Sequence, residues 1–263
     1  MPSEQVLHRE IVGLQRAEFA KASCWQTAIL FIQGGIAAVA VGSAFSPPNI
    51  TYALTLTALV LAAAWQFAHY KLKASRAQAE RARRSTLLMD GLGEQISEAE
   101  LRDIRRSFTV SLEQGRIHED GAYYDAKAGA GESRLAEMLE ESAFWSHDLL
   151  EKSATVMIGF FLASLAAAVF LLLAIVFIFD GAVLQKSARA VCAAITLFVS
   201  AEVFGAAVAF ASAARCVERV NLRLTALRGS GARRADLLQI MGDYNSAVEG
   251  ALLFVPGVYR RNR

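Results

Sequence analysis

Four long apolar stretches dominate the sequence, at residues 25–45, 51–68, 154–179 and 190–214. A helix rises about 1.5 Å per residue, so roughly 20 residues cross the ~30 Å hydrocarbon core of a bilayer. Because lipid offers no partner for backbone polar groups, only helices and closed barrels span a bilayer. These stretches lack the strict alternation of apolar and polar residues that is typical of barrel strands. The sequence therefore predicts an all-α integral membrane protein with four transmembrane helices in two hairpins.

Lysine and arginine indicate the side of the membrane on which each loop lies. Of the 27 such residues, only Lys186 and Arg189 fall in the two short loops, at residues 46–50 and 180–189. The segments after the second and fourth stretches are rich in arginine, and short basic loops stay in the cytoplasm. Both termini and the long middle segment are therefore predicted to be cytoplasmic.

The expected organisation has five parts. A cytoplasmic amphipathic helix (1–24) leads into the first hairpin (25–69), and a helical cytoplasmic insert (70–153) connects it to the second hairpin (154–214), which is followed by cytoplasmic C-terminal helices (215–263). The first apolar stretch is expected to be a retained anchor and not a cleaved signal peptide, because glutamates precede it and its length exceeds that of a usual signal core.

Helix signals divide the cytoplasmic insert. Gly91 and Gly93 are expected to end the helix that continues from the second apolar stretch. Ser97 and Glu100 form a capping box, so a new helix should begin there and run to Gly115.

Three further segments carry apolar residues at helical spacing. The helix that begins near residue 132 should bury Leu135, Met138, Leu139, Ser142, Trp145 and Leu149. The segment after the fourth stretch repeats Val217, Val220, Leu224 and Leu227. A final helix over residues 232–252 should bury Leu237, Leu238, Met241, Tyr244 and Val248.

Composition and motifs exclude several classes of protein. The net charge of +2 is too small for a protein that binds bulk nucleic acid. Cys24, Cys192 and Cys216 show no paired spacing, and isolated His118 and His147 form no metal-ligand pattern. The sequence contains no P-loop, zinc-protease or nucleophile-elbow motif. We therefore expect no enzyme activity, no cofactor and no metal.

Two polar side chains inside the apolar stretches could have a functional role. Glu202 lies at the middle of the fourth stretch, where a carboxylate costs roughly 2.5 to 3.5 kcal/mol. It is interpreted either as a gate or ion-path residue or as a polar clamp between helices. Gln33 is a second candidate at depth in the first stretch.

Small residues recur at every fourth position in two of the stretches. They are Gly34, Ala38 and Gly42 in the first, and Ala201, Gly205 and Ala209 in the fourth. This spacing permits close helix packing in lipid, either within the chain or between subunits. Because one chain offers few polar residues to line a pore, a conducting form should be a homo-oligomer, for which a tetramer is the expected size.

Cationic and aromatic residues of the insert are candidates for binding a phosphorylated ligand. The set is Arg102, Arg105, Arg106, Arg116 and Tyr124. Arginine can bind phosphate in a bidentate manner, and tyrosine can stack on a base. The alternative is ordinary ion pairing along a solvated helix, for example between Glu98 and Arg102.

Several short motifs together carry a resemblance to a known family. They are Leu14 to Lys21 before the first stretch, Tyr124-Asp125, Arg134, Glu141 to Trp145 before the third stretch, Asp243-Tyr244-Asn245, Pro256 and Tyr259. With the two predicted hairpins around a cytoplasmic insert, the chain resembles the SMODS-associating four-transmembrane effectors, which are encoded beside bacterial nucleotide second-messenger synthases.

The resemblance implies an antiphage effector of the bacterial inner membrane. A cyclic di- or oligonucleotide would bind the cytoplasmic part, and the helices would respond by permeabilising the membrane and halting growth. The residues alone leave two other readings open, a small ion- or proton-coupled transporter that uses Glu202 and a non-conducting membrane scaffold.

Overall fold

The computed structural model describes residues 2–119, 124–178, 203–231 and 233–255, together with Gly181 and Val191. Within these ranges every regular element is a helix, which confirms the all-α class. The first helix, α1, runs unbroken over Pro2–Phe45. The predicted amphipathic helix and the first apolar stretch are thus one rod of 44 residues, about 66 Å long at 1.5 Å per residue.

A tight turn joins α1 to α2, which spans Pro48–Thr86. Pro47 is extended (φ −66°, ψ 161°), and Pro48 occupies the first turn of the helix, where proline lacks only an N–H that would be unpaired anyway. The α-helix then widens into a π-helix, η1, over Leu87–Leu92. Gly93 ends it in the left-handed region (φ 73°), as the sequence predicts for this glycine.

The helix predicted from Ser97 to Gly115 is two helices, and the single-helix prediction was wrong. α3 covers Glu98–Ser107 and α4 covers Leu112–Ile117. Ser97 caps α3 as expected, but Ser111 and Gln114 form a second, complete capping box that starts α4.

The second half of the chain contains three described helices. α5 spans Glu132–Ile178 and begins at the predicted residue, so the third apolar stretch continues the helix that begins at Glu132. α7 covers Val203–Ser230, and α8 covers Arg234–Gly250. Of the fourth apolar stretch, residues 190 and 192–202 lie outside the described residues.

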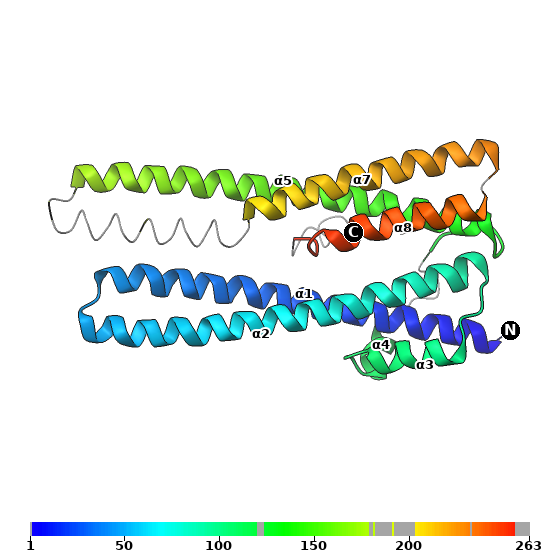
Figure 1. The fold of residues 1–263 in the computed structure, drawn as a ribbon, viewed down its shortest axis with the longest axis horizontal. Coiled ribbons are helices and arrows are strands. Elements are labelled where there is room, and N and C mark those ends of the chain that lie inside the picture. Colours follow the sequence, from blue (N-terminus) through cyan, green and yellow to red (C-terminus); the bar gives the residue numbers. More distant parts are fainter. Residues whose placement is uncertain are drawn as a thin grey trace.

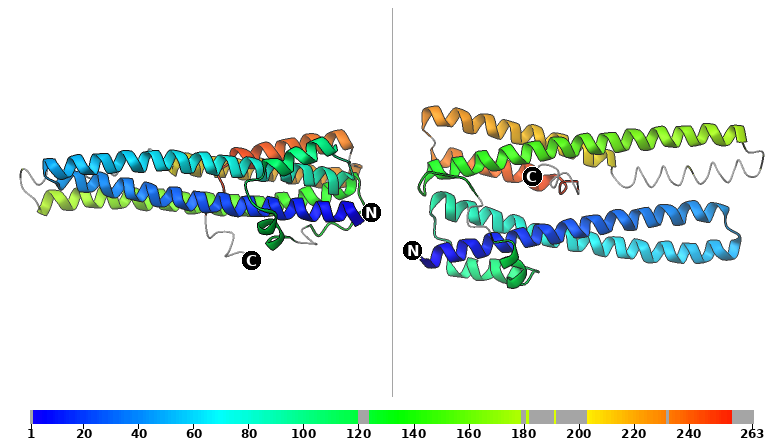
Figure 2. Two further views of the ribbon diagram at one scale, coloured as in Figure 1. Left: turned by 90° about the horizontal axis from the view of Figure 1, so that it is seen from below. Right: turned by 180° about the vertical axis from the view of Figure 1, so that it is seen from behind.

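The helices form two elongated layers, as the two views in Figures 1 and 2 show. Antiparallel α1 and α2 make one layer, and α5, α7 and α8 make the other, with α3 and α4 against the first layer. The N-terminus, the end of α2, the start of α5 and the end of α7 lie at the same end of the molecule (Figure 1). The charged residues that the structure describes lie outside the apolar segments of these helices, toward this end, which is called the charged end below.

The hydrophobic core lies at the charged end. η1, α5, α7 and α8 contribute one cluster, which includes Leu87, Leu139, Leu224 and Tyr244. The predicted burial of Leu135, Val217 and Leu237 is confirmed. Trp145 and Leu238, which were also expected to be buried, are exposed. Trp145 instead packs edge-on against Phe144, because the buried face of α5 follows residues 135, 139, 143 and 150.

Away from the charged end, the long helices expose large apolar side chains. Phe31 and Phe170 are 78% and 70% exposed, and Leu59 and Val60 are both 68% exposed. Among the described residues, three helices are long and apolar enough to cross a membrane, within Arg9–Phe45, Pro48–Leu92 and Glu132–Phe170. Such continuous apolar surface is costly in water, so these helices are compatible with a membrane protein.

Candidate functional site

A group of buried polar residues joins the two layers at the charged end. Arg76, Glu80 and Arg83 share one face of α2, because they are spaced four and three residues apart. Tyr244 and Asn245 of α8 lie opposite them. We call these five residues the polar seam.

Arg83 is the centre of the polar seam. Its guanidinium donates a hydrogen bond to Asn245 Oδ1 at 3.1 Å and pairs with Glu80 Oε2 at 2.8 Å. The same guanidinium lies 5.1 Å from the centre of the Tyr244 ring, a cation–π distance. The Tyr244 hydroxyl is hydrogen-bonded to Ser146 Oγ of α5 at 2.9 Å, so three helices meet around one cation.

Further arginine contacts extend the connection along α2 and α8. Arg76 donates to the Val248 carbonyl at 2.8 Å, and Arg84 pairs with Glu249 at 3.2 Å. Long side chains therefore bridge these two helices. The layers also meet through apolar packing where η1 lies against α5.

Burial opposes the charges of the polar seam. Desolvation raises the pKa of Glu80 above its ordinary value of 4.5, although Arg83 and Arg76 act in the opposite direction. Burial also disfavours the charged form of Arg76, which lowers the pKa of its guanidinium. Among the described residues, Arg83 Nε and Thr86 Oγ1 are buried without a hydrogen-bond partner. Because desolvation offsets most of the attraction in a buried ion pair, the polar seam adds little net stability to the contact between the layers.

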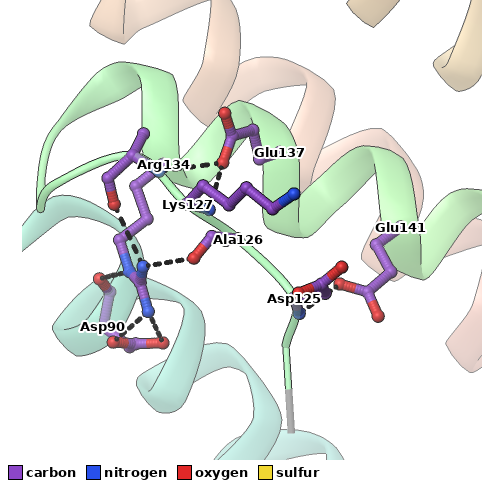
Figure 3. Close-up of polar contacts among 8 residues, drawn as sticks. Asp90, Asp125, Ala126, Lys127, Arg134, Glu137 and Glu141 are labelled. Atoms are coloured by element: carbon purple, nitrogen blue, oxygen red, sulfur yellow. Dashed lines mark hydrogen bonds and ion pairs between the residues drawn. The ribbon is translucent and has the colours of Figure 1, made fainter. Parts of the chain in front are cut away.

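A second polar group fixes the segment before α5, as Figure 3 shows. Arg134 donates to both carboxylate oxygens and the carbonyl of Asp90, and to the carbonyls of Ala126 and Ala128, all at 3.0 Å. Glu137 accepts from the N–H groups of Lys127 and Ala128 at 2.8 and 3.1 Å. We call this group the Arg134 clamp; it ties η1 to the start of α5.

A third group holds the segment between α3 and α4 against α1. Glu18 is fully buried, and its carboxylate accepts from the N–H groups of Thr109 and Val110 and from the Thr109 hydroxyl. Lys21 donates to the Thr109 carbonyl at 2.9 Å, and Arg16 donates to the carbonyl of His118 at 3.0 Å. This use of the Thr109 and Val110 N–H groups explains why α3 cannot continue to Gly115.

These groups account for most of the motifs behind the family resemblance. Glu18 and Lys21 belong to the first motif, Arg134 is in the clamp, and Tyr244 and Asn245 are in the polar seam. Asp125 donates its N–H to Glu141, which makes a further motif pair part of the same loop (Figure 3). Glu18, Lys21, Asp125, Arg134, Tyr244 and Asn245 are therefore occupied in contacts that hold the charged end together, whereas Phe144 and Trp145 are exposed.

The predicted ligand-binding residues lie in two places. Arg102 and Arg105 on α3 are exposed and face Glu98 at 3.8 Å and Glu10 at 3.0 Å, while Arg106 and Arg116 are also exposed. Tyr124 instead packs against the cluster of the other layer. The four arginines thus belong to α3 and α4, whereas Tyr124 is on the side of α5, and the nucleotide site built from all five stays a prediction.

The predicted intramembrane residues are described only in part. Glu202 and Ala201 lie outside the described residues. Gln33 is half-buried, and Gly34 and Ala38 are exposed, with no atom within 4 Å of the position that a Cβ on Gly34 would take. The other small residues of the two stretches differ in their surroundings. A Cβ on Gly42 would lie 3.9 Å from Leu54 Cδ1, whereas Gly205 is exposed and Ala209 is half-buried.

Comparison with known proteins adds no identification. No protein-family model, curated protein or solved structure matches the chain. Within the described residues, no group of three His, Cys, Asp or Glu side chains is placed to hold a metal ion.

Sequence reasoning missed the polar seam. The basic residues after the second apolar stretch, which include Arg76, Arg83 and Arg84, were interpreted first as a sign of membrane topology. The available signal was Glu80, which stands four residues after Arg76 and three before Arg83 on one helix face. That spacing indicates a charged cluster, but it does not indicate burial against α8.

Proposed function

We propose that this chain is a membrane effector that permeabilises the bacterial inner membrane as a homo-oligomer, under the control of a cyclic nucleotide sensed on the cytoplasmic side. In this proposal four helices span the bilayer in two hairpins, and both termini are cytoplasmic. The nucleotide and the antiphage role come from the family resemblance. The control mechanism comes from the geometry described above.

The observation that carries the proposal is the continuity of the long helices. α1, α2 and α5 each contain both an apolar segment and a part of the packed charged end. A bilayer core of ~30 Å covers less than half of the 66 Å rod formed by α1, so the remainder projects into the cytoplasm. Because a helix is stiff, a shift at the charged end would be transmitted directly to the membrane segments.

The polar seam is suited to be the element that moves. It joins the layers through one buried cation and its partners, and separating the layers there returns the charges to water. A ligand that binds the separated form more tightly would shift the equilibrium toward it. The Glu18 contacts would meanwhile hold α3 and α4 on α1, and the Arg134 clamp would still join η1 to the start of α5.

The proposed homo-oligomer has a candidate contact surface on α1. Gly34 and Ala38 are exposed in the single chain, and small residues allow the backbones of two helices to approach closely in lipid. Helix contacts of this kind, repeated around an axis, would build a tetramer. This surface of α1 supports the proposed homo-oligomer.

Dye leakage from liposomes tests the proposal. The purified protein is reconstituted, its insertion is checked by resistance to alkaline extraction, and cyclic di- and trinucleotides are added one at a time. We expect leakage to change with at least one nucleotide. Leakage unchanged across the panel in vesicles that contain inserted protein would overturn the proposal. Proton flux that requires Glu202 but no nucleotide would favour the transporter.

A pair of α2 variants tests the role of the polar seam. Arg83→Gln removes the central cation and leaves Glu80 buried beside Arg76, so we expect leakage that no longer depends on the nucleotide. Arg81→Gln is the matched control, because Arg81 lies two residues away on α2 and pairs with Glu100 and Asp103 on the exposed side. Equal leakage from the two variants would show that the seam does not control the membrane helices.

A further inference from the structure

α7 and α8 enclose a hollow of about 580 Å³ that none of the contacts described above uses. Small residues face each other across it, including Ala213 on α7 and Ala247 and Gly250 on α8. The hydroxyls of Ser212 and Ser246 belong to its wall as well. Because the facing side chains are short, the two helices leave a groove where longer side chains would have filled the space.

The groove crosses the boundary between apolar and charged sequence. Its lining on α7 begins at Ala209 and ends at Arg223, about 21 Å apart along the helix at 1.5 Å per residue. The fourth apolar stretch ends at Ala214, and Arg215 is the first basic residue after it. One end of the groove is therefore lined by alanine and the other by charged side chains.

Arg219 is the cation best placed to receive an anion. Arg223 is already ion-paired with Asp243, whereas Arg219 donates to Cys216 Sγ at 3.1 Å, and a thiol is a weak acceptor. Arg219 also lines an adjoining hollow of about 370 Å³ with Arg215 and Glu218. A phosphate diester offers oxygens that bind guanidinium far better than sulfur does.

We propose that this groove binds the phosphate of an anionic phospholipid from the cytoplasmic leaflet, with Arg219 as its main ligand. The inference rests on the membrane placement in the proposed function. The alanine end would lie along the first part of the acyl chains, and the arginine end would reach the headgroup. A basic pocket between helices at the cytoplasmic surface is a recurring form of lipid headgroup site. A soluble phosphate ester carries the same anion but has no acyl chain that could pack against the apolar end of the groove.

The test is lipid retention by the full-length protein in a neutral detergent, measured by native mass spectrometry. Phosphatidylglycerol and phosphatidylcholine with identical acyl chains are added separately, and glycerol 3-phosphate provides the soluble arm. We expect phosphatidylglycerol to be retained in preference to phosphatidylcholine. Loss of a charge-assisted hydrogen bond should make Arg219→Gln bind it roughly tenfold more weakly.

Two further variants keep the result interpretable. Ser246→Leu fills the groove from an exposed position, so it should reduce retention without disturbing the core. Arg81→Gln removes a partly exposed arginine of α2, outside the groove, and should retain as much lipid as the native chain. Equal retention of the two lipids, or equal binding by Arg219→Gln and Arg81→Gln, would overturn the proposal. Binding of glycerol 3-phosphate in place of lipid would overturn the lipid assignment.

Failure of this inference is distinguishable from failure of the proposed function. A protein that leaks dye in response to a nucleotide but shows no lipid preference would refute only the groove. A protein that partitions into the soluble fraction without detergent would refute the membrane placement on which both ideas depend. Lipid retention without leakage would support the groove and count against the effector.

Discussion

Replacement of Arg134 by lysine is the sharpest test of how the charged end is held together. The guanidinium makes five hydrogen bonds, two to the Asp90 carboxylate and three to the backbone carbonyls of Asp90, Ala126 and Ala128. Lysine keeps the positive charge, but its ammonium is a compact group that cannot span these acceptors. The change therefore removes the planar arrangement of hydrogen-bond donors and preserves the positive charge.

The expected magnitude follows from the bonds that lysine cannot make. The ion pair with Asp90 is partly exposed, with side-chain exposures of 20% and 23%, and we assume that lysine retains this pair and one of the three carbonyl hydrogen bonds. Hydrogen bonds to a charged group contribute about 1.5 to 3 kcal/mol each, so loss of two carbonyl bonds at the lower value costs about 3 kcal/mol. At 1.4 kcal/mol per factor of ten, local opening should become about 100-fold more frequent.

Amide hydrogen exchange measures this opening directly. The N–H groups of Lys127 and Ala128, which donate to Glu137, should lose protection by about 100-fold in Arg134→Lys. Arg102→Lys is the control, because Arg102 is exposed and lies 3.8 Å from its partner on the same helix. An increase below about threefold, or equal exchange in the two variants, would refute the reasoning that the Arg134 clamp orders this segment.

Three further predictions address other buried contacts. Glu18→Gln turns a carboxylate that accepts three hydrogen bonds into an amide, so amide exchange of the segment between α3 and α4 should rise by a factor that corresponds to about 1 to 3 kcal/mol. Burial raises the pKa of Glu80 above 4.5, so the stability that this carboxyl group contributes is complete below pH 4.5 and is lost as the pH rises through the folded-state pKa. The melting temperature of the native chain should therefore fall relative to that of Glu80→Gln over that pH interval. Parallel pH profiles of the two melting temperatures would contradict this prediction. Gly13→Ala places a Cβ 2.5 Å from the carbonyl oxygen of Gly115, so α4 should detach and exchange faster, whereas Gly129→Ala has open space and should change little.

The sequence by itself determined the all-helical class of this protein and several of its helix ends. Hydropathy placed the loop at residues 46–50 before α2, Gly93 placed the end of the helix that continues α2, and the spacing after Glu132 placed the start of α5. These features depend on a residue and its near neighbours along the chain, because helix propensity and capping act within about one turn. The order of residues in the sequence likewise determines the separation of the apolar segments from the basic ones.

Only the tertiary structure decided how the charged end is joined. Arg83 and Asn245 are 162 residues apart in sequence, and nothing near either one indicates the other. The end of α3 at Ser107 depends on Glu18, which is 91 residues from Thr109. Gly13, which the sequence shows only as an interruption in a helix, is the site where α1 and α4 approach too closely for a side chain. Each of these features requires the packing of distant segments, since the partner that makes a residue important is supplied by the fold.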